Sequence, residues 1–165
     1  SWVYHGSLHL TLKCLGDTPD PLIEAVSHAL APVCSVFAAD SGSMQGLGYF
    51  SFKGTPSVLF ARVDGWKLPA MLATALEKEL AELGIPPESR PFKTHLTLAR
   101  IRSIRNIVRF EECVHRYATD KIQEAAADRV VYYESILRPQ GPVYKPMVVI
   151  PLPGVKQSAS ELGKA

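Results

Sequence analysis

The sequence predicts an α+β protein whose antiparallel strands pack against amphipathic helices. Two helical stripes of apolar residues occur, over residues 20–32 and 69–84. Between them, short apolar runs over 34–40, 47–53 and 58–64 follow one another with only turn residues separating them. Because neighbouring strands joined by short turns pair antiparallel, these runs favour sheets of the α+β class over a strictly alternating α/β fold.

Residues 8–15, LHLTLKCL, alternate apolar and polar side chains, which predicts a half-buried strand. The helix over 20–32 follows, with Asp20 suited to cap it and Pro21 suited to its first position. The stripe over 69–84 is amphipathic and ends at Gly84, so a second helix is predicted there.

The C-terminal half is predicted to contain four further strands and one helix. A strand is predicted over 94–101, where the alternation of 8–15 recurs, and a helix over 106–119. Three further strands are predicted near 122–126, 129–137 and 143–151, and the tail over 155–165 is expected to lie outside the ordered part. The total is eight strands and three helices.

Composition sets the broad class of protein. Apolar residues make up 47% and charged residues 21% of the chain, which is typical of an ordered globular protein. The net charge of +2 is compatible with a phosphate-bearing partner but does not indicate one. The longest apolar run is too short to cross a bilayer, and three cysteines without close pairs suggest a reducing compartment, so we expect a cytoplasmic protein with no membrane partner.

The tetrapeptide His-Leu-Thr-Leu occurs twice, at residues 9–12 and 95–98, each time within a predicted strand. A strand projects residues i and i+2 to the same side, so each motif offers an imidazole and a hydroxyl on one face while its leucines enter a core. Cleaving a phosphodiester requires a base and an acid, and histidine serves either task near neutrality. The threonine hydroxyls would bond the non-bridging oxygens.

Each histidine could also be an ordinary surface or core residue without a catalytic role. A single strand histidine is most often a surface or core residue, and only the matched pair favours catalysis by His9 and His95. We expect His28 and His115 on helix surfaces and His5 in a loop. A zinc site with His9, His95 and a carboxylate is an alternative, but no close pair such as His-x-x-x-His supports it, so no metal is expected.

Three stretches resemble the two-histidine (2H) phosphoesterase superfamily, and specifically its LigT-like RNA 2′,3′-cyclic phosphodiesterases, also called 2′-5′ RNA ligases. HLTLKCLGD is similar to the family's first motif, RPFKTHLTLARI to its second, and VVYYESILRPQGPVYKPMVVIPL to its C-terminal signature. GLGYF and VLFARV also fit, so the likeness spans about residues 2–152.

The resemblance implies a bilobal fold within one domain, residues 1–165: two antiparallel sheets related by pseudo-twofold symmetry around a central cleft, with helices on the outer faces. Members of the family begin with a further strand and helix that are absent from this chain. Either the sequence is a fragment of a longer native chain, or the protein covers in some other way the sheet edge that the missing strand would leave unpaired.

The resemblance also implies an activity, the hydrolysis of a terminal 2′,3′-cyclic phosphate to a 2′-phosphate with neither metal nor cofactor. By position, His9 would be the acid and His95 the base, although a pseudo-symmetric site allows the roles to exchange. Thr11 and Thr97 would hold the phosphate. Arg100 would correspond to the arginine of the second motif.

Two basic residues and four aromatic residues could extend this site. Strict alternation places Arg100 on the face opposite His95, so its role requires a bulge or a strand end; otherwise it is an exposed edge residue. Alternation places Lys13 on the cleft face, as a phosphate contact or a solvated lysine. Four aromatic residues could stack on bases, with core packing as the default: Trp2, Tyr49, Phe50 and Tyr144.

Alternative functions keep the same cleft. The substrate could be a small cyclic nucleotide such as an ADP-ribose cyclic phosphate, or the reaction could run backwards as a 2′-5′ ligation. A different class would be a non-catalytic module that binds RNA ends. We expect a monomer whose partner is RNA with a 2′,3′-cyclic phosphate end or a small cyclic nucleotide.

Overall fold

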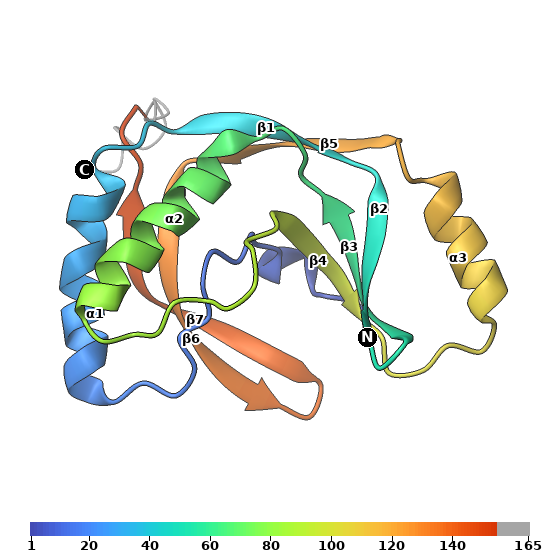
Figure 1. Ribbon diagram of the computed structural model, residues 1–165, viewed down its shortest axis with the longest axis horizontal. Helices are drawn as coiled ribbons and strands as arrows, with labels where there is room; N and C mark the ends of the chain where they lie inside the picture. The colour runs from blue at the N-terminus through green and yellow to red at the C-terminus, as the bar shows by residue number, and fades with distance from the viewer. Residues whose placement is uncertain (155–165) are drawn as a thin grey trace, which may run out of the picture.

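The computed structural model describes residues 1–154 and confirms the α+β class with antiparallel strands (Figure 1). The expected tail over 155–165 lies outside the described residues. A 3₁₀ turn, η1 (His5–Ser7), precedes three α-helices: α1 (Asp20–Cys34), α2 (Lys67–Glu82) and α3 (Ile107–Arg116). The strands of the described part are β1 (Asp40–Gln45), β2 (Leu47–Phe52), β3 (Thr55–Arg62), β4 (His95–Arg100), β5 (Lys121–Ala127), β6 (Arg129–Arg138) and β7 (Gly141–Pro151).

The fold has two lobes joined by a β1–β5 ladder, which runs across the top of Figure 1. One lobe carries the β6–β7 hairpin with α1 and α2, and the other carries the sheet β2-β3-β4 with α3. Gly46 separates β1 from β2 at a φ of 82°. A β-carbon there would clash with the carbonyl oxygen of Ala118, so this bend between the lobes requires glycine.

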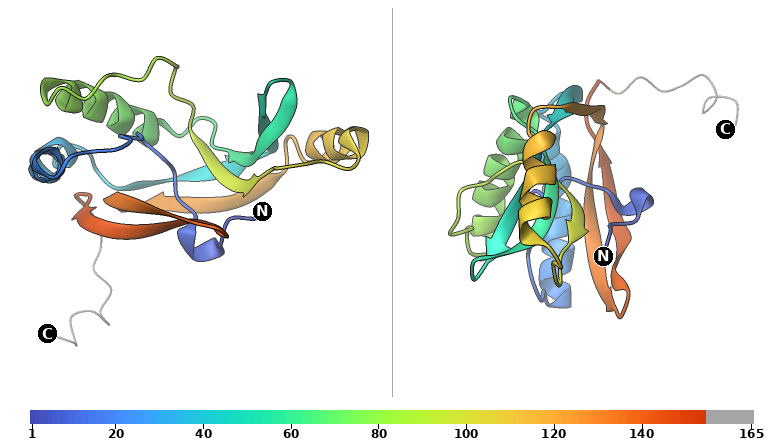
Figure 2. Two further views of the ribbon diagram at one scale, coloured as in Figure 1. Left: turned by 90° about the horizontal axis from the view of Figure 1, so that it is seen from below. Right: turned by 90° about the vertical axis from the view of Figure 1, so that its right-hand side faces the viewer.

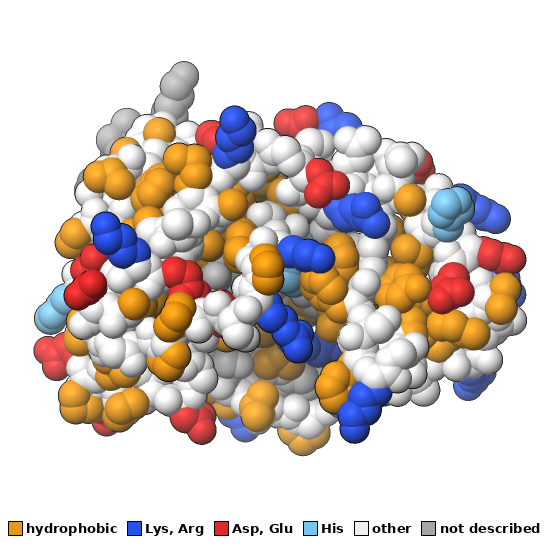
Figure 3. Space-filling model, viewed as in Figure 1, with side chains coloured by type: hydrophobic (Ala, Val, Ile, Leu, Met, Phe, Trp, Pro, Cys, Tyr) orange, Lys and Arg blue, Asp and Glu red, His pale blue; other side chains and the backbone are white. Residues whose placement is uncertain are grey.

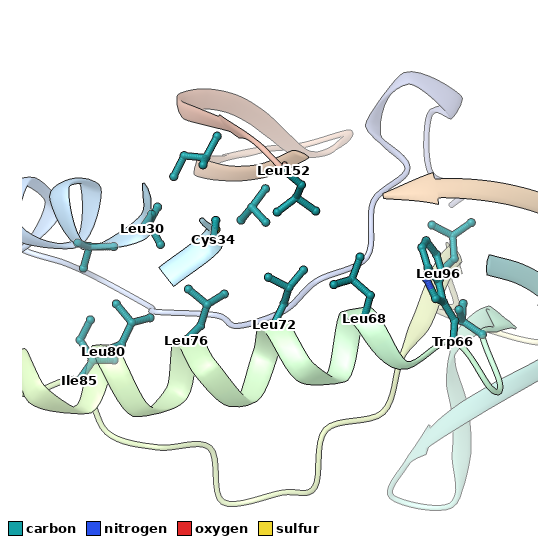
Figure 4. Close-up of a cluster of buried hydrophobic side chains, with 14 of the residues drawn as sticks. Leu30, Cys34, Trp66, Leu68, Leu72, Leu76, Leu80, Ile85, Leu96 and Leu152 are labelled. Atoms are coloured by element: carbon teal, nitrogen blue, oxygen red, sulfur yellow. The ribbon is translucent and has the colours of Figure 1, made fainter. Parts of the chain in front are cut away.

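The main core lies between the two long helices and the β6–β7 hairpin. Apolar residues recur every four positions along α2, so one face of this helix is buried. Figure 4 shows that face directed towards α1 and Leu152, with Leu30, Cys34, Leu68, Leu72, Leu76 and Leu80 among the packed side chains. The predicted helix over 69–84 is therefore confirmed.

The N-terminal segment covers the edge of β4 that β3 leaves unpaired. The amide of Val3 donates to the carbonyl of Leu98 at 2.8 Å, and the amide of Arg100 donates to the carbonyl of Ser1 at 2.9 Å. The chain then leaves the edge through η1, which lies beside the β6–β7 hairpin in both views of Figure 2. It returns to β4 at one isolated antiparallel bridge, between Leu10 and Leu96.

Two strand predictions were wrong. The predicted strand over 34–40 is occupied by the end of α1 and a turn, because Val26, Leu30 and Cys34 continue the buried helical stripe to the last residue of that helix. The predicted strand over 8–15 reduces to the single bridge at Leu10. After this bridge the chain departs towards α1. In residues 1–154, no helix has both the length and the apolar character needed to cross a membrane.

Candidate active site

The Leu10–Leu96 bridge brings the two repeated motifs together. In antiparallel pairing, this register sets His9 opposite Thr97 and Thr11 opposite His95. Leu96 is buried and Leu10 packs against the same core, so the four polar side chains project to the other side. Directly opposite residues have β-carbons about 5 Å apart and diagonal ones about 7–8 Å apart, which leaves room for one phosphate between the imidazoles.

Both imidazoles are held by the same local contact. Nδ1 of His9 lies 2.7 Å from the carbonyl oxygen of Ser7, and Nδ1 of His95 lies 2.7 Å from the carbonyl oxygen of Lys93. A carbonyl oxygen only accepts hydrogen bonds, so Nδ1 is the protonated nitrogen in each ring. Nε2 is therefore the nitrogen that accepts or releases a proton in both histidines.

Aromatic rings fix the position of each imidazole. The ring centroid of His9 lies 5.7 Å from that of Tyr133 and 4.8 Å from that of Tyr144 on the β6–β7 hairpin. His95 has a comparable pair on the other lobe, with Phe50 at 4.9 Å and Phe60 at 5.4 Å. Each imidazole thus has one anchoring carbonyl and two neighbouring rings, which come from the β6–β7 hairpin for His9 and from β2 and β3 for His95.

A hollow of about 270 Å³ lies beside these motifs. Its lining includes His9, Thr11, Thr97 and Arg100, and its opposite wall comes from the β6–β7 hairpin, with Arg138, Gln140 and Tyr144. His95 is outside this lining, two positions from Thr97 along β4. Of the described residues around the hollow, two are arginines and none is acidic, so it suits an anion.

A β-bulge sets the direction of Arg100. Leu59 of β3 pairs with Ala99, whereas the next residue, Phe60, pairs with Thr97, so Leu98 has no partner in β3. This extra residue shifts the alternation of β4 by one position. Arg100 consequently shares the face of Thr97 and lines the hollow. A role for Arg100 in the site required a bulge or a strand end, and the bulge at Leu98 provides it.

Lys13 does not join the site, and the placement of its side chain on the cleft face was wrong. Its ammonium donates to Oε1 of Glu77 on α2 at 2.7 Å and to the carbonyl of Pro86 at 3.0 Å, and only 4% of the side chain is exposed. Residue alternation ceases to apply once the chain leaves the bridge at Leu10, and the side chain turns into an ion pair instead.

The aromatic candidates divide between the two sides of the molecule. Trp2 and Tyr144 line the hollow, with Trp2 77% exposed, and Phe50 contacts His95. Tyr49 lies on the other face of its sheet, where its hydroxyl donates to Glu111 and its ring packs on Phe110.

The sequence reasoning missed several residues around the imidazoles. They comprise the carbonyl groups of Ser7 and Lys93, the rings of Phe60 and Tyr133, and the hairpin residues Arg138 and Gln140. The two carbonyls belong to the backbone, which every residue carries, so they leave no mark in the sequence. The other contacts depend on strand register and carry no local signal.

The remaining histidines stay apart from this site. His5 is exposed in η1, His28 is exposed on α1 and His115 is exposed on α3. Within residues 1–154, no three side chains of the metal-binding types gather closely enough to hold an ion. In the space-filling view, Lys and Arg side chains surround a hollow near the middle of the molecule, and a histidine is visible within it (Figure 3).

Two copies of a motif that carries an imidazole and a hydroxyl, brought together by a strand bridge beside a hollow that suits an anion, define the class of two-histidine phosphoesterases. The family model for the "LigT like Phosphoesterase" matches residues 70–144. An RNA 2′,3′-cyclic phosphodiesterase of Thermotoga maritima is 30% identical over 145 residues, covering 88% of this chain and 75% of the relative. The chain belongs to the LigT-like phosphoesterase family.

Solved structures agree with this assignment. The crystal structure of TT0787 from Thermus thermophilus superposes with a TM-score of 0.72 at 31% identity, covering 93% of this chain and 82% of that one. Escherichia coli LigT complexed with 3′-AMP also gives a TM-score of 0.72, at 20% identity, over 92% of this chain and 80% of that one. The likeness to E. coli LigT concerns the fold alone.

Proposed function

We propose that the protein is an RNA 2′,3′-cyclic phosphodiesterase, which hydrolyses the cyclic phosphate at an RNA end to a 2′-phosphate without a metal. The observation that carries the proposal is the matched anchoring of His9 and His95. In both, Nδ1 is bound to a carbonyl oxygen at 2.7 Å, so that Nε2 is the reactive nitrogen. The name of the Thermotoga maritima relative, RNA 2′,3′-cyclic phosphodiesterase, supports the same substrate class.

The proposed reaction is a displacement at phosphorus in which the two imidazoles act from opposite sides. Nε2 of His95 takes a proton from water as the water oxygen bonds to phosphorus. The bond from phosphorus to the 3′ oxygen breaks, and protonated Nε2 of His9 delivers its proton to that oxygen. The products are a 2′-phosphate and a 3′-hydroxyl, and each histidine ends in the protonation state in which the other began.

The remaining site residues would stabilise charge on the phosphate. The hydroxyls of Thr11 and Thr97 stand opposite the two histidines in the bridge register and would donate to the non-bridging oxygens. Arg100 brings a guanidinium to the same hollow, where negative charge increases as water attacks. The two lobes of the chain would thus work as one domain, each supplying half of the site.

An assay on a defined oligonucleotide ending in a 2′,3′-cyclic phosphate tests the proposal. In buffer with EDTA we expect conversion to an end that carries a 2′-phosphate, identified by mass and by sensitivity to phosphatase. Replacing either His9 or His95 with Ala should abolish it. Full activity in both variants, or tight binding of the oligonucleotide without any product, would refute the proposed reaction.

A further inference from the structure

A run of arginines leads out of the hollow along the chain. Arg100 lines the hollow, and Arg102, Arg105 and Arg109 follow it within the loop after β4 and the first turn of α3. No acidic residue occurs between Arg100 and Phe110. The four arginines together carry more positive charge than the net +2 of the whole chain, so the remainder of the protein is net negative. Positive charge is therefore concentrated on this segment.

The segment is held in place at both ends. Ile101 and Phe110 pack against the small core of Leu59, Ala99 and Val114. The amide of Ile101 also donates to the carbonyl of Ser57 at 2.8 Å. Ile101 therefore anchors the backbone between Arg100, which lines the hollow, and Arg102, which is exposed.

The helix start is equally fixed. Asn106 caps α3, where its side-chain oxygen accepts a hydrogen bond from the amide of Arg109 at 2.9 Å. This end of the helix is also the positive end of its dipole. A rigid backbone with a positive helix end presents the arginine side chains in a set order.

These arginines are available to an external partner. Arg102, Arg105 and Arg109 are exposed, and none forms a salt bridge with another described residue. The nearest carboxylates along the chain are Glu111 and Glu112, which bound the run at its far end, and Glu111 accepts a hydrogen bond from Tyr49. Exposed guanidinium groups on a fixed backbone are suited to the phosphates of a nucleic acid strand.

We propose that Arg102, Arg105 and Arg109 form a track that binds the RNA backbone leading up to the cyclic phosphate. This inference rests on the proposed function. A 2′,3′-cyclic phosphate occurs only at a 3′ end, so the rest of the strand leaves the site on its 5′ side and needs a single exit. The arginine track supplies that exit and selects single-stranded RNA of several nucleotides over a mononucleotide.

Matched substrates test the track in the full-length protein. We would measure kcat/KM on a mononucleotide 2′,3′-cyclic phosphate and on oligonucleotides of increasing length with the same end. The variant Arg102→Gln/Arg105→Gln/Arg109→Gln should keep the wild-type kcat/KM on the mononucleotide. It should lose the rise in kcat/KM that the wild type shows as the oligonucleotide becomes longer. The corresponding triple Lys variant should retain most of that gain, because charge is preserved.

Salt dependence provides a second readout. On single strands, each phosphate neutralised contributes about 0.7 to the slope of log affinity against log salt, so three contacts predict an extra loss on the order of tenfold between about 50 and 200 mM salt. The wild type should show this loss on the oligonucleotide but not on the mononucleotide, and the triple Gln variant on neither.

The matched control is Arg116→Gln, which removes an exposed arginine from the last turn of the same helix, and thermal unfolding would verify that all variants fold. If kcat/KM rises equally with oligonucleotide length in the wild type and in the triple Gln variant, the proposed arginine track is wrong. Mononucleotide turnover without any gain in the wild type also overturns it but leaves the proposed function standing. Absence of turnover on every substrate refutes the proposed function itself.

Discussion

Leu10 and Leu96 face each other across an isolated antiparallel bridge, with Leu96 buried and Leu10 packed against the same core. This one contact sets the register of two segments that are far apart in the sequence. It places the histidine and threonine of each motif on the face opposite the leucines. A core contact thereby determines the geometry of the candidate active site.

The pH dependence of kcat/KM should identify the acid and the base. We expect a bell-shaped profile, because the proposed mechanism needs His95 deprotonated and His9 protonated. His95→Gln should lower the rate by about 10²–10⁴-fold and remove the rising limb, and His9→Gln should lower it equally and remove the falling limb. If the limbs lost are exchanged, the two roles are exchanged as well. His28→Gln, on the exposed surface of α1, is the control and should leave the profile unchanged.

Arg100 should contribute through its charge at the hollow. Arg100→Gln is expected to reduce kcat/KM by about 10²-fold, comparable to the loss of one group that stabilises a developing negative charge. Arg100→Lys should recover part of the activity. Arg129→Gln provides the comparison, since Arg129 is exposed and lies 3.9 Å from the carboxylate of Asp128, away from the hollow. An Arg100→Gln enzyme with wild-type kcat/KM would contradict a role in catalysis.

Lys13 should affect stability and not substrate binding. Lys13→Met removes the partner of Glu77 and leaves a carboxylate only 25% exposed, so we expect a loss of roughly 1–3 kcal/mol in the free energy of unfolding. Adding Glu77→Gln in a double-mutant cycle should recover part of this loss. Chemical denaturation measures both effects, while KM should stay at the wild-type value. A selective rise in KM at unchanged stability would show instead that Lys13 reaches the substrate.

Cys34 should make the protein less stable at alkaline pH. Burial between α1 and α2 raises the pKa of the Cys34 thiol, so the unfolded chain ionises at a lower pH than the folded protein does. Stability is therefore unaffected below the ordinary thiol pKa and falls as the pH rises above it, by up to about 1.4 kcal/mol per pH unit.

Denaturation at several pH values checks this expectation. Cys34→Ala should flatten the alkaline part of the curve, whatever its effect on absolute stability, and Cys14→Ala, at an exposed thiol, should leave the slope as it is. In the native protein an alkylating reagent should modify Cys14 and Cys113 well before Cys34. Rapid native labelling of Cys34 would contradict its burial.

Local patterns predicted much of the fold. The helix α2 and the strand β4 are confirmed, because the apolar stripe of α2 and the alternation at the start of β4 follow from which side chains each element buries. The strand predicted over 34–40 failed for a related reason. Its apolar residues fit a strand as well as the end of a helix, and only packing of Cys34 in the core favours the helix.

The sequence by itself determined the chemistry available to this protein: two imidazoles and two hydroxyls, repeated in identical order so that each motif separates polar from apolar side chains. Only the tertiary structure decided how these groups meet. The Leu10–Leu96 bridge, the bulge at Leu98 that turns Arg100 towards the hollow, and the ion pair that draws Lys13 to α2 all depend on contacts between distant segments. Such contacts depend on how separate elements pack, and no periodicity within a single element encodes them.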